Sequence, residues 1–305
     1  MKIFILDAFH PAGVEYAARH AEVVRWDDPG VKRWAEEADA IMVRMTRIGA
    51  EDLARAKKLK MICKQGVGVD TIDLDAAKAH GIPVCRTPGA NSEAVAEMAL
   101  TLALSVARRA TEMDRMVRAG AKIVRPDILG LEMWQKTVGV VGLGAIGRRV
   151  AQKWGGAFES RICFFDPAVT EAKYRKFENL AEMLPEVDVL TIHVPLGNET
   201  RKLIGKNQLA LMKPSAILVN TARGGIVDEA ALYDALKAGK LFGAGLDVWE
   251  VEPPAKDNPL LRLPNVVATP HASGGTHETQ ERSSLQVAEQ VLEVLAGKPA
   301  RNRVA

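Results

Sequence analysis

Residues 136–167 read KTVGVVGLGAIGRRVAQKWGGAFESRICFFDP. The apolar run at 137–141 is typical of a short strand buried on both faces, and apolar side chains recur at helical spacing over residues 146–154. Three glycines with the spacing G-x-G-x-x-G lie where the two segments meet. The stretch therefore predicts a strand, a glycine turn and a helix, in that order.

Each of the three glycines has its own physical role. Gly142 permits a tight turn, Gly144 lets the backbone approach a pyrophosphate because it has no Cβ, and Gly147 lets the helix pack closely on the strand. Phosphates would then lie at the helix N-terminus, where unpaired N–H groups and the helix dipole favour negative charge. A glycine turn alone is also compatible with a purely structural role, so the prediction of a dinucleotide site depends on its surroundings.

An acidic residue completes this pattern. The second predicted strand, residues 162–165, ends in Asp166, about 20 residues after Gly144. A carboxylate at this position can accept hydrogen bonds from both ribose hydroxyls and would repel a 2′-phosphate. The stretch therefore predicts an NAD site and favours NAD over NADP.

Length and composition predict a two-domain enzyme. A chain of 305 residues is long for one core, and 26% charged with 48% hydrophobic residues is an ordinary soluble mixture. The net charge of +3, without a dense Lys/Arg block, argues against a nucleic-acid surface. The most continuous apolar stretch, residues 98–107, is too short to span a bilayer, so no membrane partner is expected.

The cysteines and the N-terminus predict a cytoplasmic location. Cys63, Cys85 and Cys163 are odd in number and lack C-x-x-C spacing, so we expect buried thiols in a reducing cytoplasm. Neither a disulfide framework nor a metal site is expected. Met1 and Lys2 lead directly into an apolar strand and not into a signal peptide.

The first 90 residues alternate between strand-like and helical segments. Such alternation predicts parallel strands with helices on both faces, and therefore a small α/β domain. The predicted strands are residues 2–6, 22–25, 40–43, 60–63 and 83–85, and the predicted helices are 13–20, 50–57 and 74–80.

A long helix is expected next, from Ser92 as its N-cap to about Ala119, with Gly120 as the C′ residue. Residues 94–107 are apolar on nearly every face, so we expect this helix to be buried between the domains and against a second subunit. A homodimer through this helix follows. Met113, Met116 and Val117 have helical spacing and are expected in the core.

The rest of the chain continues the alternation and predicts a doubly wound sheet around the glycine turn. No internal repeat and no low-complexity linker is present. The further predicted strands are residues 187–194, 216–220, 243–248 and 266–269, and the further helices are 206–212, 229–238 and 277–296.

Three strand ends carry residues that can do chemistry. They read NTARGG at 220–225, DVWEVEPP at 247–254 and TPHASGG at 269–275. Ligands of open α/β sheets bind at the carboxyl ends of the strands, so these segments are expected to converge. They offer a guanidinium to bind a carboxylate, an imidazole to protonate a ketone oxygen and an acid to hold that imidazole charged. This set is the minimum for hydride transfer to a 2-oxo acid.

These motifs, taken together, resemble the signature series of the NAD-dependent D-isomer-specific 2-hydroxyacid dehydrogenases. The similarity extends upstream to GVGVD at 66–70 and to residues 91–97, and so covers nearly the whole chain. The resembling motifs are GLGAIG at 142–147, Asp166, TARGG at 221–225, Asp247-Val248 with Glu252-Pro253, and Pro270-His271.

The resemblance implies a fold and a division of the chain. The fold class would be α/β, with a Rossmann-type doubly wound NAD domain at residues 94–277. A smaller flavodoxin-like α/β substrate domain would be discontinuous in sequence and comprise residues 1–93 and 278–305. Composition alone does not indicate this discontinuity.

The resemblance also implies roles for single residues. Arg223 would bind the substrate carboxylate, and His271 would be the general acid in reduction and the base in oxidation, with Glu252 paired to it. Asp247 would hold the nicotinamide carboxamide. The implied cofactor-binding residues are Val67, Gly142, Gly144, Ala145, Ile146, Gly147, Asp166, His193, Val194, Pro195, Thr200, Thr221, Ala222, Asp247 and Gly274.

Simpler explanations stay open for several of these side chains. Arg223 could be a surface cation, and His271 could be a capping or packed histidine. Glu252 could be a solvated turn acid, with Glu250 as the competing carboxylate. His193 is expected to support the end of its strand and not to take part in the chemistry.

Two further cations bear on the substrate. Arg44 and Lys64 end predicted strands just before the Gly66-Val67-Gly68 turn, whose N–H groups the resemblance assigns to the substrate carboxylate. If both cations line the substrate site, they would favour a substrate with a second anionic group at C3, such as 3-phosphoglycerate. Hydroxypyruvate and glyoxylate are the next candidates. The alternative is that both are solvated strand-end charges.

Two departures from the family pattern are visible. Many members carry Gly-x-Trp before the dinucleotide fold, but here Gly120 is followed by Ala121 and Lys122, which affects the expected substrate specificity. The chain ends at Ala305, so appended regulatory domains are not expected. A second hypothesis is a binding protein that senses NAD, similar to the C-terminal-binding-protein corepressors, although no peptide-docking feature is evident.

Overall fold

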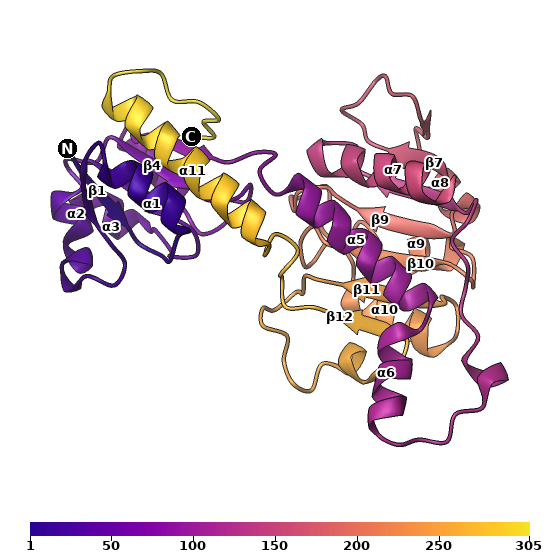
Figure 1. Ribbon diagram of the computed structural model, residues 1–305. Helices are drawn as coiled ribbons and strands as arrows, with labels where there is room; N and C mark the ends of the chain where they lie inside the picture. Colours follow the sequence, from indigo (N-terminus) through magenta and orange to yellow (C-terminus); the bar gives the residue numbers. More distant parts are fainter. The chain divides into compact units, whose positions relative to one another are not determined.

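The computed structural model describes all residues from 1 to 305 and contains two compact units. Unit 1 comprises residues 1–91 and 275–305, and unit 2 comprises residues 92–274 (Figure 1). Each unit has its own parallel sheet. None of the helices is long and apolar enough to cross a lipid bilayer.

Unit 1 contains a five-stranded parallel sheet in the order β2-β1-β3-β4-β5. This is the flavodoxin-like doubly wound order, in which ligands bind at the carboxyl ends of the strands. The elements are β1 (Lys2–Ile5), α1 (Pro11–Ala18), β2 (Glu22–Val24), η1 (Pro29–Arg33), α2 (Trp34–Glu37), β3 (Ala40–Val43), α3 (Ala50–Arg55), β4 (Met61–Lys64), α4 (Leu74–Ala79), β5 (Val84–Arg86) and α11 (His277–Leu295).

The last helix of the chain completes unit 1. Val287 and Val291 of α11 are fully buried in the same core as Ile3. Helix α11 also lies directly against α1, because a Cβ on Gly13 would stand only 2.0 Å from the Ser284 Oγ. The discontinuous α/β fold is therefore confirmed.

Unit 2 contains a seven-stranded parallel sheet in the order β12-β11-β10-β9-β6-β7-β8. This is the Rossmann-type order, with its topological switch point between β6 and β9, and it confirms the predicted fold class. The elements are α5 (Ser92–Ala107), α6 (Ala110–Arg118), η2 (Arg125–Ile128), β6 (Thr137–Val141), α7 (Ala145–Phe158), β7 (Arg161–Phe165), β8 (Arg175–Lys176), α8 (Leu180–Met183), η3 (Leu184–Glu186), β9 (Val189–Ile192), α9 (Lys206–Leu211), β10 (Ile217–Asn220), α10 (Glu229–Lys237), β11 (Gly243–Leu246), η4 (Pro259–Arg262) and β12 (Val266–Ala268).

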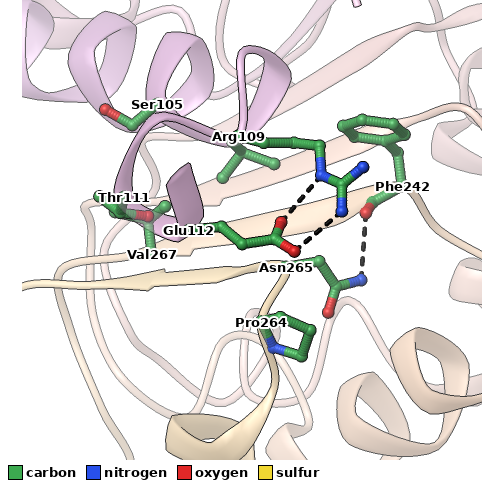
Figure 2. A pocket seen from close by; sticks show the side chains of 9 residues that line it. Ser105, Arg109, Thr111, Glu112, Phe242, Pro264, Asn265 and Val267 are labelled. Atoms are coloured by element: carbon green, nitrogen blue, oxygen red, sulfur yellow. Dashed lines mark hydrogen bonds and ion pairs between the residues drawn. The ribbon is translucent and has the colours of Figure 1, made fainter. Parts of the chain in front are cut away.

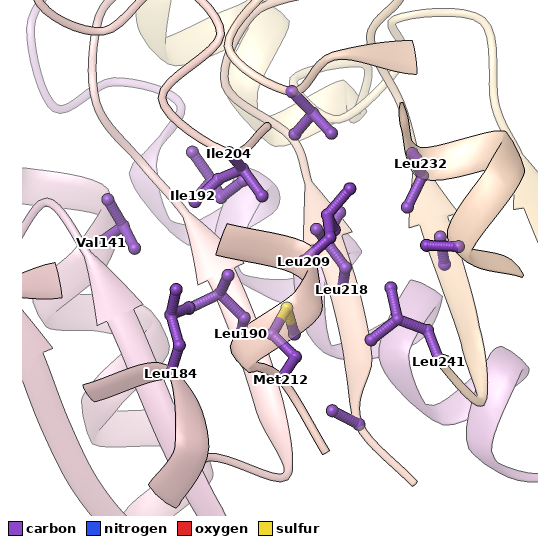
Figure 3. Packing of buried hydrophobic residues seen from close by; sticks show 14 of the residues in the cluster. Val141, Leu184, Leu190, Ile192, Ile204, Leu209, Met212, Leu218, Leu232 and Leu241 are labelled. Atoms are coloured by element: carbon purple, nitrogen blue, oxygen red, sulfur yellow. The ribbon is translucent and has the colours of Figure 1, made fainter. Parts of the chain in front are cut away.

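A hydrophobic core covers each face of the sheet in unit 2. Successive residues of a strand point to opposite faces, so Leu218 belongs to one core while Val219 belongs to the other. Figure 3 shows the first core, where Leu209 and Met212 from α9 and the turn after it lie over Leu190 and Leu218. Because both faces are covered, the strand ends that carry the candidate residues start from a rigid sheet.

The predicted helix over residues 92–119 is wrong as one element, since it breaks between α5 and α6. Arg109 adopts a left-handed conformation with φ 50°. The Ala107 carbonyl accepts a hydrogen bond from the Leu131 N–H at 2.7 Å, so it is not available to Thr111 four residues later. Gly130 makes this approach possible, because a Cβ there would lie 2.4 Å from that carbonyl oxygen.

Helix α6 also differs from the prediction in its burial. It has no buried residue, and Val117 is 67% exposed, so the prediction that Met113, Met116 and Val117 belong to the core is wrong. The predicted end of the helix is confirmed, since Gly120 has φ 64° and its N–H donates to the Val117 carbonyl. The segment after α6 exposes further apolar side chains, namely Val124, Leu129 and Trp134.

The three cysteines are buried and unpaired, as predicted for buried thiols. Cys63 and Cys85 occupy paired positions of β4 and β5, and Cys163 lies in β7. Burial raises the pKa of Cys163 to about 11, so its thiol stays protonated at neutral pH. None of the three thiols is activated as a nucleophile.

Candidate active site

The glycine turn joins β6 to α7 in unit 2. Gly142 has φ 89°, and a Cβ there would lie 2.8 Å from the His193 carbonyl oxygen. A Cβ on Gly147 would lie 2.0 Å from the Gly142 carbonyl oxygen, so the helix can start here only without a side chain. Nothing lies within 4 Å of a Cβ on Gly144, the N-cap residue of α7. The turn is thus closed on its inner side and open at the helix N-terminus.

Asp166 follows β7 and contacts this turn directly. One carboxylate oxygen accepts from the Leu143 N–H at 2.7 Å, and the other accepts from the Ala168 N–H at 2.8 Å. A carboxylate offers about four acceptor positions, so both oxygens can accept further bonds. The acid therefore holds the glycine turn and still has acceptor positions for a ribose.

His193 and Thr221 follow the neighbouring strands β9 and β10, whose last residues are paired. The His193 Nε2 lies 2.8 Å from the Thr191 Oγ1, but its Nδ1 and the Thr221 Oγ1 are buried without a hydrogen-bond partner. Burial lowers the pKa of His193 to about 3, so its ring is neutral and cannot be a general acid at neutral pH. Two unpartnered polar atoms beside an open glycine turn fit a polar ligand such as a dinucleotide.

Further predicted cofactor residues lie around the same edge, whereas Val67 belongs to unit 1. Ala145 and Ile146 open α7, and Val194 and Pro195 continue from His193. The Thr200 hydroxyl donates to the Pro195 carbonyl at 2.6 Å and closes that turn.

Arg223 lies in a turn that Asn220 holds in place. The Asn220 side chain accepts from the Ala222 N–H at 3.0 Å and donates to the Arg223 carbonyl at 2.9 Å. The next residue, Gly224, is in direct backbone contact with the following strand end, because a Cβ there would stand 1.7 Å from the Trp249 carbonyl oxygen. The Arg223 turn and the segment that carries Glu252 are therefore fixed against each other.

Glu252 and His271 form the only pair of an acid and an imidazole among the hydrogen bonds of the site. The His271 Nδ1 lies 2.7 Å from a Glu252 oxygen, and the second oxygen accepts from the Trp249 N–H at 3.1 Å. Glu250 instead accepts from the Glu229 N–H, so Glu252 is the carboxylate in contact with the ring. This pairing leaves the Nε2 as the ring atom that can exchange a proton with a ligand.

Asp247 is fully buried and holds the segment that contains His271. Its carboxylate accepts from the Thr269 hydroxyl at 2.5 Å, from the N–H groups of Ala272 and Ser273 at 2.9 Å each, and from the Ser273 hydroxyl. Its main-chain carbonyl accepts from the His271 N–H at 2.7 Å. These bonds, which the sequence did not predict, fix a histidine whose φ of 54° is left-handed.

The two predicted substrate cations belong to unit 1. Arg44 follows β3 and Lys64 ends β4, and the Lys64 ammonium donates to the carbonyls of Arg44 and Gln65. The Asp7 carboxylate accepts from the N–H groups of Arg44 at 2.5 Å and Met45 at 3.0 Å. Lys64 is buried, and its hydrogen bond to the Arg44 carbonyl ties the loop that carries Arg44 to the end of β4.

The turn Gly66-Val67-Gly68 follows at the carboxyl end of β4. Gly66 has φ 111°, and its N–H donates to the Thr87 hydroxyl at 2.7 Å. The predicted substrate residues of unit 1 thus lie at one edge of its sheet.

Gly274, the last of the predicted cofactor residues, is the final residue of unit 2.

A cavity of about 160 Å³ lies elsewhere in unit 2 (Figure 2). Phe242 and Asn265, which line it, directly precede β11 and β12, and the ion pair of Arg109 with Glu112 at 2.8 Å lies beside them. It is therefore at the amino ends of the strands, whereas the candidate residues are at the carboxyl ends. The cavity is separate from the candidate active site.

Comparisons with known proteins agree with this geometry. A family model described as "D-isomer specific 2-hydroxyacid dehydrogenase, NAD binding domain" matches residues 100–273. A D-3-phosphoglycerate dehydrogenase of Archaeoglobus fulgidus is 41% identical over 100% of the chain, which spans 59% of that relative's length. A glyoxylate reductase of Korarchaeum cryptofilum is 39% identical, with 99% of the chain and 95% of the relative covered.

A solved structure is equally similar. The TT0316 protein from Thermus thermophilus is 39% identical and superposes with a TM-score of 0.91 over 100% of both chains.

Proposed function

Because the chain belongs to the D-isomer-specific 2-hydroxyacid dehydrogenase family, we propose that it transfers a hydride between NAD and C2 of a small 2-hydroxy or 2-oxo acid. The observation that carries this proposal is the hydrogen bond between Glu252 and His271 at the carboxyl edge of an NAD-binding sheet. NAD, when bound, supplies or accepts the hydride. The glycine turn, Asp166 and the buried polar atoms of His193 and Thr221 would hold it.

The remaining steps belong to side chains of this protein. His271 would donate a proton from its Nε2 to the substrate oxygen in reduction and take it back in oxidation, while Glu252 stabilises the charged ring. Arg223 would bind the substrate carboxylate and orient the carbonyl group for attack. We assign the substrate-binding role to unit 1 and the NAD-binding role to unit 2, whose bounds of 1–91 with 275–305 and of 92–274 differ by two or three residues from the predicted 1–93 with 278–305 and 94–277.

The preferred substrate, in this proposal, carries a second anionic group at C3, as 3-phosphoglycerate does. Arg44 supports it, because it lies at the carboxyl end of β3, the edge at which parallel sheets bind ligands. The turn at 66–68, at the end of β4, would bind the substrate carboxylate itself. Hydroxypyruvate and glyoxylate are the alternative substrates. The relatives are divided in the same way, since one is named a phosphoglycerate dehydrogenase and the other a glyoxylate reductase.

Replacing Arg44 by alanine tests this choice. We expect kcat/KM for phosphohydroxypyruvate to fall by about 10- to 100-fold, because a charge-assisted hydrogen bond contributes about 1.5 to 3 kcal/mol. The value for glyoxylate should stay within about twofold, since it has no second anion for Arg44 to bind. A neutral 2-oxo acid preferred by tenfold and unaffected by the substitution would contradict the anionic-substrate proposal and leave the dehydrogenase assignment intact.

Cofactor choice gives a second prediction. Replacing Asp166 by alanine should reduce the preference for NADH over NADPH, because the carboxylate that repels a 2′-phosphate is removed. The ratio of kcat/KM values for the two cofactors measures this. Equal efficiency of the parent protein with both cofactors would show that Asp166 does not select NAD.

The functional unit, we further propose, is a homodimer in the cytoplasm. Apolar side chains in the segment around α6 are exposed, among them Val117 at 67%, Leu129 at 72% and Trp134 at 57%, and a second copy would cover them. Sedimentation should give twice the chain mass of 33.1 kDa, and the mass of one chain would contradict the dimer. The three buried, unpaired thiols favour a reducing compartment.

A binding protein that senses NAD is the second candidate function. The dinucleotide fold is compatible with it, because a fold does not choose a reaction. The hydrogen bond between Glu252 and His271 favours the enzyme over the binding protein, since binding NAD alone does not require a general acid.

A further inference from the structure

The segment that carries Glu252 is exposed and needs support. Trp249 and Leu260 are buried at 3% and 0%, but most of the chain between them is exposed to solvent. The side chains of His271 and Glu252 are themselves 45% and 37% exposed. A pair in contact with water gains little from charge alone, so its geometry depends on what holds the two side chains. Asp247 holds His271, and the other partner must be held separately.

Glu229, the first residue of α10, contacts both ends of this exposed segment. One carboxylate oxygen accepts from the Glu250 N–H at 2.5 Å, and the other accepts from the Asn258 Nδ2 at 2.9 Å. The Asn258 amide is oriented for this contact, because its oxygen accepts from the Leu260 N–H at 3.0 Å. In return, the Glu229 N–H donates to a Glu250 side-chain oxygen at 3.3 Å. A single carboxylate thus bridges residues 250 and 258.

This bridge bears directly on Glu252. The N–H groups of Trp249 and Glu250 are consecutive, and they donate to the side chains of Glu252 and Glu229, respectively. The peptide group that joins Trp249 to Glu250 is planar and rigid. Holding the Glu250 N–H therefore also restrains the Trp249 carbonyl and the direction of the chain at Trp249. The position of the Glu252 carboxylate depends on Trp249, because one of its oxygens accepts from the Trp249 N–H while the other contacts the His271 ring.

We propose that Glu229 is a positioning residue of the active site: by bridging Glu250 and Asn258 it keeps the Glu252 carboxylate within hydrogen-bond distance of His271. The inference rests on the proposed dehydrogenase function. Glu229 does not contact His271 itself and acts only through Glu252.

Steady-state kinetics of Glu229→Ala test the proposal. Misplacement of a catalytic group by about 1 Å can cost about 100-fold in rate, so we expect kcat to fall by about tenfold or more. The dissociation constant of NADH and the KM of the 2-oxo acid should stay within about twofold. Asp234→Ala is the matched control, because it removes an exposed acid from the same helix and should leave kcat unchanged.

A double-mutant cycle separates positioning from a general loss of structure. In the Glu252→Gln background, Glu229→Ala should cause less than a twofold further loss of kcat, since the group that it positions is already altered. A loss as large as that in the parent protein would overturn the proposal, and so would an unchanged kcat in Glu229→Ala alone. Glu229→Gln keeps the side-chain size but can accept from only one of the two donors, so we expect an intermediate loss.

Hydrogen exchange tests the bridge without any turnover. The Glu250 amide should exchange at least about tenfold faster in Glu229→Ala than in the parent protein, because its acceptor is removed. Equal exchange in both proteins would overturn the bridge. If the parent protein exchanges slowly at Glu250 but reduces no 2-oxo acid, the proposed function fails while the bridge stands.

Discussion

Replacement of His271 by alanine is expected to lower kcat for 2-oxo acid reduction by about 10²- to 10⁴-fold, the usual contribution of a positioned general acid. The Nδ1 of this histidine is held by Glu252 at 2.7 Å, and its main chain is held by Asp247. The ring is therefore placed to transfer a proton through its Nε2. Alanine removes the proton donor and leaves the glycine turn and Asp166 in place.

Cofactor affinity separates this expectation from unfolding. NADH fluorescence titration should give the same dissociation constant, within about twofold, for His271→Ala and the parent protein, because NADH binding does not use the imidazole. His80→Ala removes an exposed histidine at the end of α4 and is the matched control. Near-normal reduction of every accepted 2-oxo acid by His271→Ala would show that another group is the acid.

The second large effect is expected for Arg223→Ala. The guanidinium would bind the substrate carboxylate in both the ground state and the transition state, so its loss should mainly raise KM. We expect kcat/KM to fall by about 100-fold or more, equivalent to about 2.7 kcal/mol, since a substrate carboxylate is left unpaired. Steady-state kinetics with one 2-oxo acid measure both parameters.

A lysine at this position refines the test. Arg223→Lys keeps the positive charge but cannot bind a carboxylate with two parallel hydrogen bonds. Its kcat/KM should therefore lie between the values of the parent protein and of Arg223→Ala. Arg262→Ala removes an exposed arginine at the end of η4 and should change nothing. A fall in kcat with unchanged KM for Arg223→Ala would contradict a carboxylate-binding role.

The fold could be predicted because its signals are local. The spacing of Gly142, Gly144 and Gly147 reflects contacts within one turn, and Asp166 follows in the next strand. The break between α5 and α6 could not be predicted in this way. It depends on a hydrogen bond from Leu131 to Ala107, and nothing near Arg109 in the sequence signals a contact with a later segment.

The site residues were less predictable than the fold. The resemblance favoured Glu252 as the partner of His271, but Glu250 lies two residues away with the same chemistry, and the hydrogen bonds after Trp249 show that Glu252 is the one in contact. Asp247 and Glu229 each accept hydrogen bonds from main-chain N–H groups, whose direction depends on the folded backbone. Residue identities carry no information about such donors.

Turnover of 2-oxo acids by the parent protein tests the proposed dehydrogenase function. NADH absorbance is followed with the parent protein and a panel of phosphohydroxypyruvate, oxaloacetate, hydroxypyruvate, glyoxylate and pyruvate, and NADH binding is titrated on the same sample. We expect NADH to be oxidised with at least one of these 2-oxo acids, and we expect His271→Ala to lose this activity. Tight NADH binding without turnover of any of them would contradict the proposed dehydrogenase function and favour the NAD-sensing binding protein.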